Sequence, residues 1–221
     1  MVLEIRIANL FSIKDEITLD FRAATIKSAN AKALADNIIT ENDTSILKTI
    51  AIYGANASGK SNIIKAIRFC NAMVFESHKH NENTVYNFQP FKFDGYDKKP
   101  SNYFIRFISA GIEYEYSFSF TRFKILTESL YYYPKGRITK VFTRDERRGK
   151  TKKEKYSFGS RIKRPMDVAE NTSEKTLYIS RASQMDREIA KEIFTYFHSR
   201  FILQYVGFGV STIETLSNQN K

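Results

Sequence analysis

The sequence has few residues of the kinds that cross-link a chain or carry it through a membrane. It has no tryptophan, four prolines and one cysteine among 221 residues. The single thiol, Cys70, excludes an internal disulfide framework and suits a reducing compartment, so we expect a cytoplasmic protein. No apolar run reaches the roughly eighteen residues of a transmembrane helix. The alternating start, Met1–Arg6, is unlike a signal peptide. We therefore expect no membrane contact.

Histidine is also scarce, with three in the chain. His78 and His80 lie two residues apart with acidic residues nearby, but no other histidine or cysteine cluster would complete a metal site. We favour a solvated helix end at this position. Cys70 falls on the apolar face of a predicted helix with no base partner visible, which indicates a core thiol rather than a nucleophile.

The residues that are present can form a real core and carry a strong positive charge. Hydrophobic residues make up 42% and aromatic residues 14% of the chain, and the net charge is +11. The length fits one large domain, or a domain with a small subdomain. Residues 135–164 contain thirteen Lys or Arg against three acids. This segment predicts contact with an anionic partner such as nucleic acid. The alternative is a solvated hairpin or loop, with Arg144 to Lys155 too charged to be buried.

The stretch around residues 49–61 carries the strongest functional pattern. Thr49–Tyr53 is apolar and predicts a buried strand, and Gly54–Ser61 has the spacing Gly-x4-Gly-Lys-Ser. Apolar residues at helical spacing then predict a helix from Gly59 or Lys60 to about Ser77. A strand, a glycine-bounded turn and a helix in this order predict a phosphate-binding loop.

Each residue type in this loop has a physical role in holding phosphate. Gly54 and Gly59 permit backbone angles and close approaches that a side chain would block. Main-chain N–H groups and the positive end of the helix attract an anion. Lys60 adds an ammonium between the phosphates, and the Ser61 hydroxyl is a ligand for Mg²⁺. The predicted nucleotide-contacting residues are Gly54, Ala55, Asn56, Ala57, Ser58, Gly59, Lys60, Ser61 and Asn62.

The rest of the chain predicts mostly strands. Alternating apolar and polar residues predict a first hairpin and, later, an aromatic antiparallel meander. The aromatic residues at 118–123 and 131–133 could stack on bases, but at strand spacing they are more typical of a sheet core. The predicted strands cover residues 2–8, 16–21, 102–108, 112–120, 123–133, 138–142, 177–179 and 201–206, with a loop at 23–46, a loop at 180–186 and a helix from about 186.

These residues resemble the ATP-binding-cassette class of ATPases, in the soluble branch with SMC, RecN and OLD-type proteins. The likeness is strongest to the AAA-labelled ATP-binding proteins of bacterial abortive infection and anti-phage defence. It covers about residues 1–205. The stretches that carry it are Asn9–Ile13 leading into Leu19–Phe21, Gly54–Asn62, Pro90–Phe93, and Ile125–Leu130 with the tyrosine-rich strand.

The resemblance implies an α/β fold: a P-loop NTPase lobe of the ABC type. We expect a mixed sheet around one P-loop helix, an antiparallel meander and a short helical segment. The implied domains are an ATP-binding lobe at 1–180, with a basic loop at about 144–165, and the start of a helical subdomain with a tail at 181–221. ATP and Mg²⁺ are the implied cofactors.

The resemblance also implies further residues near the nucleotide. In this class a glutamine at the entry to the helical subdomain touches Mg²⁺ or the attacking water. Gln184 is the best positional match, and Gln89 is the second. The turn Asn9–Ser12 lies near the nucleotide in such folds, where it can contact the base or ribose.

Two patterns of the class are missing. Leu216-Ser217-Asn218 lacks the glycine of the Leu-Ser-x-Gly signature, and no apolar run ends in Asp-Glu. The chain thus resembles an N-terminal lobe, whose hydrolysis would need a C-terminal lobe or a second ATPase head. An effector protein is a further expected partner. The alternative hypothesis is a nucleic-acid-binding or regulatory module in which the loop is a structural turn.

Overall fold

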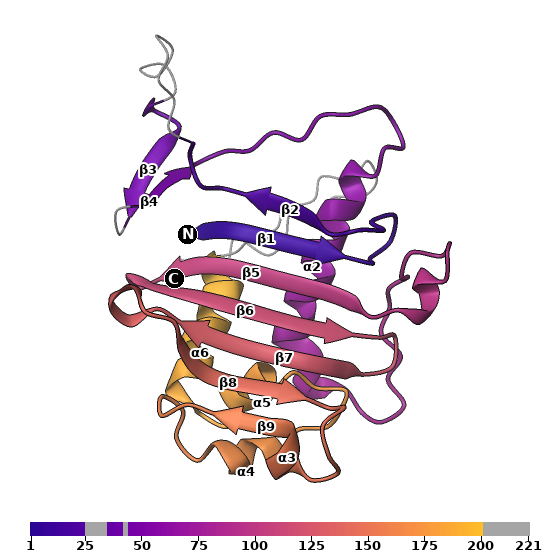
Figure 1. Cartoon of the computed structure of the whole chain (residues 1–221), viewed down its shortest axis with the longest axis vertical. Coiled ribbons are helices and arrows are strands. Elements are labelled where there is room, and N and C mark those ends of the chain that lie inside the picture. Colours follow the sequence, from indigo (N-terminus) through magenta and orange to yellow (C-terminus); the bar gives the residue numbers. More distant parts are fainter. Residues whose placement is uncertain (25–34, 42–43, 201–221) are drawn as a thin grey trace, which may run out of the picture.

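The computed structural model describes residues 1–24, 35–41 and 44–200. Its centre is a seven-stranded sheet in the order β2-β1-β5-β6-β7-β8-β9 (Figure 1). Every strand pair of this sheet is antiparallel. Its strands are β1 (Val2–Ala8), β2 (Ile17–Asp20), β5 (Ser101–Ser109), β6 (Ile112–Phe120), β7 (Ile125–Tyr132), β8 (Thr139–Asp145) and β9 (Tyr156–Phe158).

Helices and a small hairpin complete the fold. The hairpin of β3 (Ile38–Glu41) and β4 (Thr44–Leu47) lies within the segment predicted as a loop, so this part of the prediction was wrong. The helices are α2 (Lys60–Glu76), α3 (Lys152–Lys155), α4 (Pro165–Glu170), α5 (Tyr178–Gln184) and α6 (Glu188–Thr195), which continues into a π-turn at Tyr196–Arg200.

The predicted first hairpin and meander are confirmed. β1 pairs with β2 with Ile5 opposite Leu19, and β5 pairs with β6 with Ile105 opposite Tyr116. These strands follow the alternation of the sequence, because side chains at every second position point to the same face. The expectation of a mixed sheet is wrong for the described residues, since the structure shows no parallel pair among them.

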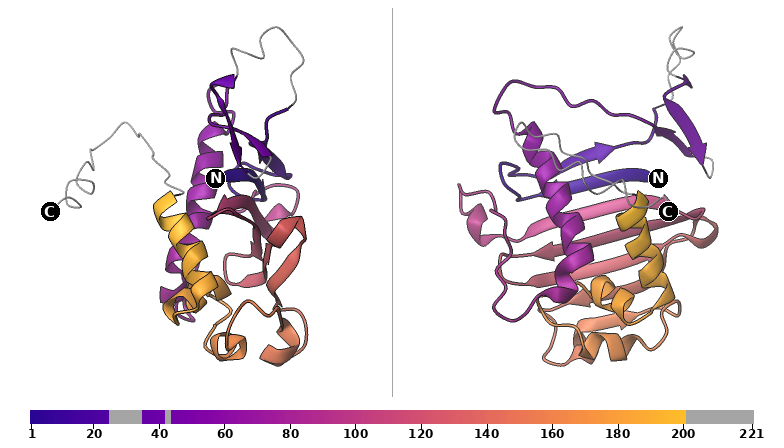
Figure 2. Two further views of the ribbon diagram at one scale, coloured as in Figure 1. Left: turned by 90° about the vertical axis from the view of Figure 1, so that its left-hand side faces the viewer. Right: turned by 180° about the vertical axis from the view of Figure 1, so that it is seen from behind.

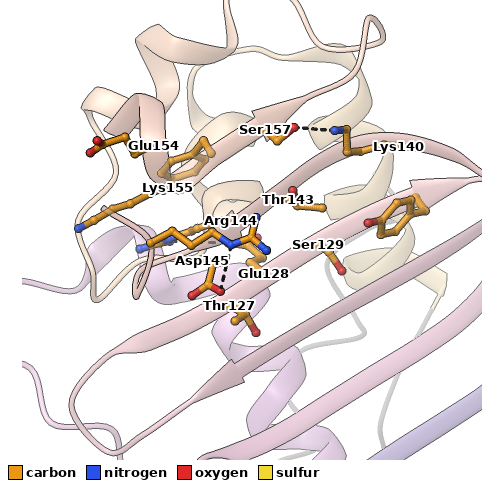
Figure 3. Close-up of a pocket in the computed structure, with 13 residues that line it drawn as sticks. Thr127, Glu128, Ser129, Lys140, Thr143, Arg144, Asp145, Glu154, Lys155 and Ser157 are labelled. Carbon is orange, nitrogen blue, oxygen red and sulfur yellow. Dashed lines mark hydrogen bonds and ion pairs between the residues drawn. The ribbon is translucent and has the colours of Figure 1, made fainter. Parts of the chain in front are cut away.

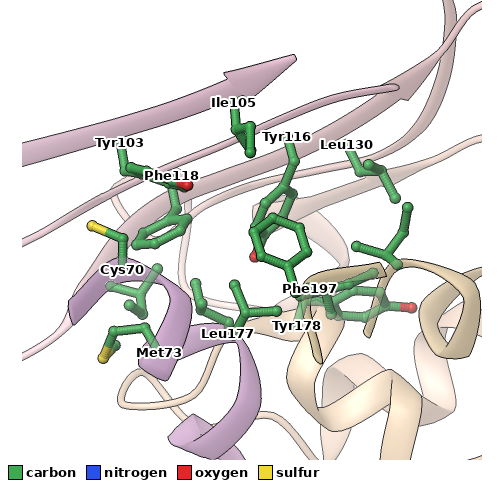
Figure 4. Packing of buried hydrophobic residues seen from close by; sticks show 14 of the residues in the cluster. Cys70, Met73, Tyr103, Ile105, Tyr116, Phe118, Leu130, Leu177, Tyr178 and Phe197 are labelled. Carbon is green, nitrogen blue, oxygen red and sulfur yellow. The ribbon is translucent and has the colours of Figure 1, made fainter. Parts of the chain in front are cut away.

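Helices α2, α5 and α6 cover one face of the sheet and leave the other face open (Figure 2). The covered face is aromatic, and the side chains of α2 and the π-turn pack into it (Figure 4). Cys70 is fully buried there, as predicted, and burial raises the pKa of its thiol well above the usual range. The core residues of this layer include Cys70, Met73, Tyr103, Tyr116, Phe118 and Phe197.

The strand predicted before the phosphate-binding loop is not formed. Thr49–Tyr53 has no strand partner among the described residues, and Ile52 and Tyr53 are 39% and 90% exposed. The run has the β-branched and aromatic residues typical of a strand. A strand also needs a hydrogen-bonded neighbour, however, and none of the described strands pairs with this run.

The strand predicted at 177–179 and the loop after it are also wrong, because this segment is helix α5. The cause is a distant carboxylate. Glu128 on β7 accepts the N–H groups of Tyr178 at 2.6 Å and Ile179 at 3.0 Å, so it binds the first turn of the helix. The strand predicted at 201–206 and the polar tail lie outside the described residues.

Arg144 contradicts the expectation that the stretch to Lys155 is too charged to bury, although residues 147–151 are exposed as expected. Arg144 is fully buried and lies 3.7 Å from Glu128 and 2.7 Å from Glu146. It also donates to the carbonyl oxygens of Ser173 and Thr176. Burial raises the pKa of the Glu128 carboxyl, and the Arg144 charge and the helix N–H groups oppose that shift. Such a buried charge is tolerated only because it is paired and hydrogen-bonded.

We predict that Glu128→Ala lowers the free energy of unfolding by about 3–5 kcal/mol, because it removes one of the two carboxylates beside the buried Arg144 and the acceptor of the Tyr178 and Ile179 N–H groups. Urea unfolding at pH 7, followed by circular dichroism, measures this change. The matched control is Glu174→Ala, which removes an exposed carboxylate 3.6 Å from Lys124 and should change stability by less than about 0.5 kcal/mol. Equal stability of the two variants would contradict the structural role of Glu128.

Candidate phosphate-binding site

The predicted loop lies at the start of α2, and its backbone has the conformation that the glycine pattern requires. Gly59 precedes the helix with φ 94° and ψ 0°, and Ala57 also has a positive φ of 64°. The loop closes on itself through a hydrogen bond from Ser58 N to Ala55 O at 3.2 Å. The predicted helix from Lys60 is confirmed, and it ends at Glu76.

Several main-chain N–H groups of this turn have no acceptor within the described part of the chain. They are those of Gly59, Lys60 and Ser61, at the point where a helix has no internal partners for its first donors. The first turn of α2 contains no acidic side chain. The site therefore presents N–H donors and the positive end of the helix without a competing carboxylate, which suits an anion.

The Lys60 side chain folds back over the loop. Its Nζ donates to Gly54 O and Ala55 O, both at 2.7 Å, and lies 3.4 Å from Ser58 Oγ. These neutral acceptors hold the ammonium beside the free N–H groups. A phosphate oxygen is a stronger acceptor than a carbonyl oxygen because it is charged, so the ammonium can exchange these bonds for a bound phosphate.

The loop rests against the turn of the first hairpin. Asn62 on α2 donates to Ser12 Oγ at 2.8 Å, and a Cβ on Gly59 would lie 2.8 Å from the same atom. A side chain at Gly59 therefore meets both a steric contact and an unfavourable φ. This finding confirms that the turn Asn9–Ser12 lies beside the predicted phosphate site.

The hairpin turn is itself fixed by Asn9. Its side-chain amide donates to Tyr96 O at 2.8 Å and Lys99 O at 2.9 Å, and its oxygen accepts from Phe91 N at 2.9 Å. Asn9 is buried and has a positive φ of 56°. The sequence predicts the turn but not the contacts of Ser12 and Asn9. Asn9-Leu10-Phe11-Ser12 is a local pattern, and the partners of these two residues come from distant parts of the chain.

A hollow of about 330 Å³ opens over the loop and is lined by Ala57, Ser58, Gly59, Lys60, Ser61 and Asn62. Its volume falls within the range of small-molecule sites. Ser61 is exposed at its rim, so its hydroxyl is free to bind a metal ion held by a phosphate. Gly54, Ala55 and Asn56 form the other limb of the loop and do not line this hollow.

Gln184 lies far from this hollow. It ends α5, which packs on the opposite end of α2 through bonds from Leu177 N to Ser77 Oγ and from His78 N to Ser180 Oγ. Seventeen helical residues span roughly 25 Å at about 1.5 Å each. The structure therefore does not bring Gln184 together with Ser61, as the prediction of a shared metal site required.

Gln89, the second glutamine, lies closer to the loop. Its carbonyl oxygen accepts a hydrogen bond from Phe11 N at 2.7 Å, in the same turn that contacts Asn62 through Ser12. The Gln89 side chain is exposed. Of the two candidates, Gln89 is the one that the fold places in the layer around the phosphate site.

His78, His80 and the Asp145-Glu146 pair make structural contacts. Nδ1 of His78 lies 3.2 Å from Ser180 Oγ, and Nδ1 of His80 lies 3.1 Å from Lys175 O. In the described ranges, no group of three or more metal-binding side chains comes together. Asp145 pairs with Arg147, and Glu146 pairs with Arg144 and Lys155, so neither acid faces the phosphate site.

The site consists of a glycine-bounded loop, a lysine and the start of a helix that packs on a sheet with an aromatic core. These features define a P-loop domain of the α/β class. Comparison with protein families agrees with this assignment to the P-loop domains. The model described as "AAA domain, putative AbiEii toxin, Type IV TA system" matches residues 50–212. This match covers most of the chain, so the protein belongs to that family of nucleotide-binding P-loop ATPase domains.

No curated protein matches this sequence. Within the described residues, none of the helices has the length and apolar character needed to cross a membrane.

We predict that Gly59→Ala destabilises the protein more than Gly95→Ala does. Both glycines have positive φ, 94° and 72°, so both substitutions introduce strain of about 1–2 kcal/mol. Only Gly59 has a neighbour within 4 Å of the added Cβ, the side chain of Ser12. Chemical unfolding compares the two variants, and Ser12→Ala combined with Gly59→Ala should recover part of the difference. Equal losses for both glycines would show that the contact with Ser12 has no effect.

Proposed function

We propose that this protein binds ATP with Mg²⁺ and serves as the nucleotide-binding lobe of an ABC/SMC-like ATPase. The observation that supports this most is the set of free N–H groups at Gly59, Lys60 and Ser61 beside the Lys60 ammonium. The loop N–H groups and Lys60 would hold the phosphates, and Ser61 would hold the metal. Bound Mg²⁺ would neutralise charge on the phosphates.

The turn Asn9–Ser12 is our candidate for contact with the base or ribose. It contacts α2 through the hydrogen bond between Asn62 and Ser12, and the hydrogen bonds of the Asn9 side chain fix its position. Phe11 in this turn is only partly buried, so its ring can offer apolar surface to a base. The whole arrangement would place a nucleotide between the P-loop and the first hairpin.

Hydrolysis would require residues beyond those that surround this loop. No carboxylate faces the hollow among the residues described to line it, and a base or water-positioning group is needed to activate water. The exposed run Thr49–Tyr53 beside the loop supports completion of the site by further protein, either a C-terminal lobe or a second ATPase head. An exposed apolar segment is a surface that a strand of another lobe or protomer can cover.

The family match suggests a biological setting. Its description names a putative toxin of a toxin–antitoxin system, which is compatible with the abortive-infection setting expected from the sequence. We propose that nucleotide binding controls docking of an effector or of a second head in such a cytoplasmic defence system.

We predict that Lys60→Ala abolishes the rise in melting temperature that ATP–Mg²⁺ produces in the wild-type protein. A ligand that binds only the folded state raises stability by about 2.7 kcal/mol at a concentration one hundred times its Kd. Differential scanning fluorimetry with and without ATP–Mg²⁺ measures this shift. Lys65→Ala is the matched control, because Lys65 is exposed on the same helix outside the hollow.

An unchanged shift in the Lys60→Ala protein would refute the role of Lys60. A wild-type protein with no shift would favour the second hypothesis, in which the loop is a structural turn in a nucleic-acid-binding or regulatory module. In that case the melting temperature should respond to nucleic acid alone.

We also predict that the pure 221-residue chain binds ATP–Mg²⁺ but hydrolyses it very slowly, because the described residues that line the hollow over the loop include no general base. A phosphate-release assay at saturating ATP measures turnover. Hydrolysis at the rates of a complete ATPase, lost in the Lys60→Ala protein, would show that the described residues already form the whole catalytic site.

A further inference from the structure

The open face of the sheet carries a row of hydroxyl side chains. Ser117 on β6 lies opposite Ser129 on β7, Ser129 lies opposite Thr143 on β8, and Thr143 lies opposite Ser157 on β9. The row therefore crosses four neighbouring strands. The oxygen atoms of Ser117 and Ser129 lie 2.8 Å apart.

These small side chains leave the sheet face hollow. A groove of about 430 Å³ lies over β7, β8 and β9, on the side away from the core helices (Figure 3). Thr127, Ser129, Thr143 and Ser157 line it, and Tyr131 is on one flank. Hydroxyl groups both donate and accept hydrogen bonds and lose little when water is replaced by another polar group.

The rim of the groove is basic. From 137 to 157 the chain has nine Lys or Arg and three acids. Lys140 lines the groove and has no carboxylate of the described residues within ion-pair distance. Arg148 lines it too, is 75% exposed and lies 3.7 Å from its single carboxylate partner, Asp145.

The acids of the groove are already occupied. Asp145 accepts two hydrogen bonds from the Arg147 guanidinium, which lowers the pKa of this carboxyl. Glu154 accepts from the N–H groups of Lys150 and Thr151, which lowers its pKa as well. Glu128, the third acid of the lining, accepts from the N–H groups of Tyr178 and Ile179. All three carboxylates thus have partners within the protein, and the groove presents hydroxyl groups and the Lys140 and Arg148 cations to a partner.

We propose that this groove binds the backbone of a single-stranded nucleic acid. The Lys140 and Arg148 cations would contact phosphates, and the hydroxyl row would donate to phosphate and sugar oxygens. The partly exposed Tyr131 ring on the flank would stack on a base, as aromatic side chains do in single-strand sites. A base can stack on Tyr131 only when it is free of its neighbours in the strand, which a single strand allows and a duplex does not.

This surface is independent of the phosphate-binding loop. The groove is lined by residues of β7, β8 and β9 on the open face of the sheet, whereas α2 lies on the covered face (Figure 2). Binding of the nucleic acid therefore does not need Lys60, and the Lys60→Ala protein should retain it. The two proposals can fail separately.

The test uses the full 221-residue chain and fluorescein-labelled twenty-nucleotide DNA and RNA of mixed sequence. Fluorescence anisotropy measures affinity from 50 to 200 mM salt. The variant Lys140→Gln/Arg148→Gln should bind about tenfold more weakly. Its dependence of log K on log salt should be shallower by about 1.4, since each phosphate contact of a single strand contributes about 0.7. Ser157→Tyr should also weaken binding, because it fills the groove without changing charge.

The matched control is Lys79→Gln/Lys191→Gln, which removes two exposed cations from the helical side of the molecule. It should bind as the wild type does, with circular dichroism confirming that all variants fold. Equal weakening in this control would overturn the proposal, because it would show attraction by overall charge alone. Absence of salt-dependent binding, or tighter binding of the same sequence as a duplex, would also overturn it.

Discussion

The packing of α2 on the aromatic face of the antiparallel sheet determines where everything functional lies. Cys70, Met73 and Val74 are buried against that face. Because the helix is rigid, its first turn is carried to the turn of the first hairpin, where Asn62 meets Ser12. The loop can then leave N–H groups free, since its position depends on the helix and not on its own hydrogen bonds. Hydrophobic packing of α2 on the sheet thus positions the P-loop, whose N–H groups and lysine are then available for electrostatic binding of an anion.

The two faces and the two ends of this scaffold have different roles. The far end of α2 is joined to α5, whose first turn is bound by the buried Glu128. That network stabilises the fold and uses Arg144, the most deeply buried cation of the basic segment. Lys140 and Arg148 of the same segment line the groove on the open face of the sheet, whereas Arg161 and Lys163 pair with Glu192 and Glu188 of α6. One charged stretch of sequence thereby supplies both an interior ion pair and the exposed groove.

Local sequence patterns predicted the parts of the structure that depend on neighbouring residues. The hairpin, the meander and the start of α2 follow from alternation and from the glycine spacing, and the structure confirms them. The predictions were wrong where contacts with residues distant in the sequence determine the local structure. Glu128 converts 178–184 from an expected strand and loop into a helix, and Glu128 with Glu146 allows Arg144 to be buried. Gln184 was placed at the site from a family pattern, and the packing of α5 puts it elsewhere.

The central claim is that main-chain N–H groups at the start of α2 bind the phosphates of ATP. Amide ¹H–¹⁵N spectra of the protein, recorded while ATP–Mg²⁺ is added, observe these groups directly. The account predicts that the largest shifts fall on Gly59, Lys60 and Ser61, with smaller shifts at Ser12 in the facing turn. Saturating ATP–Mg²⁺ that leaves these amides unmoved, or that moves only residues on the open sheet face, would contradict it.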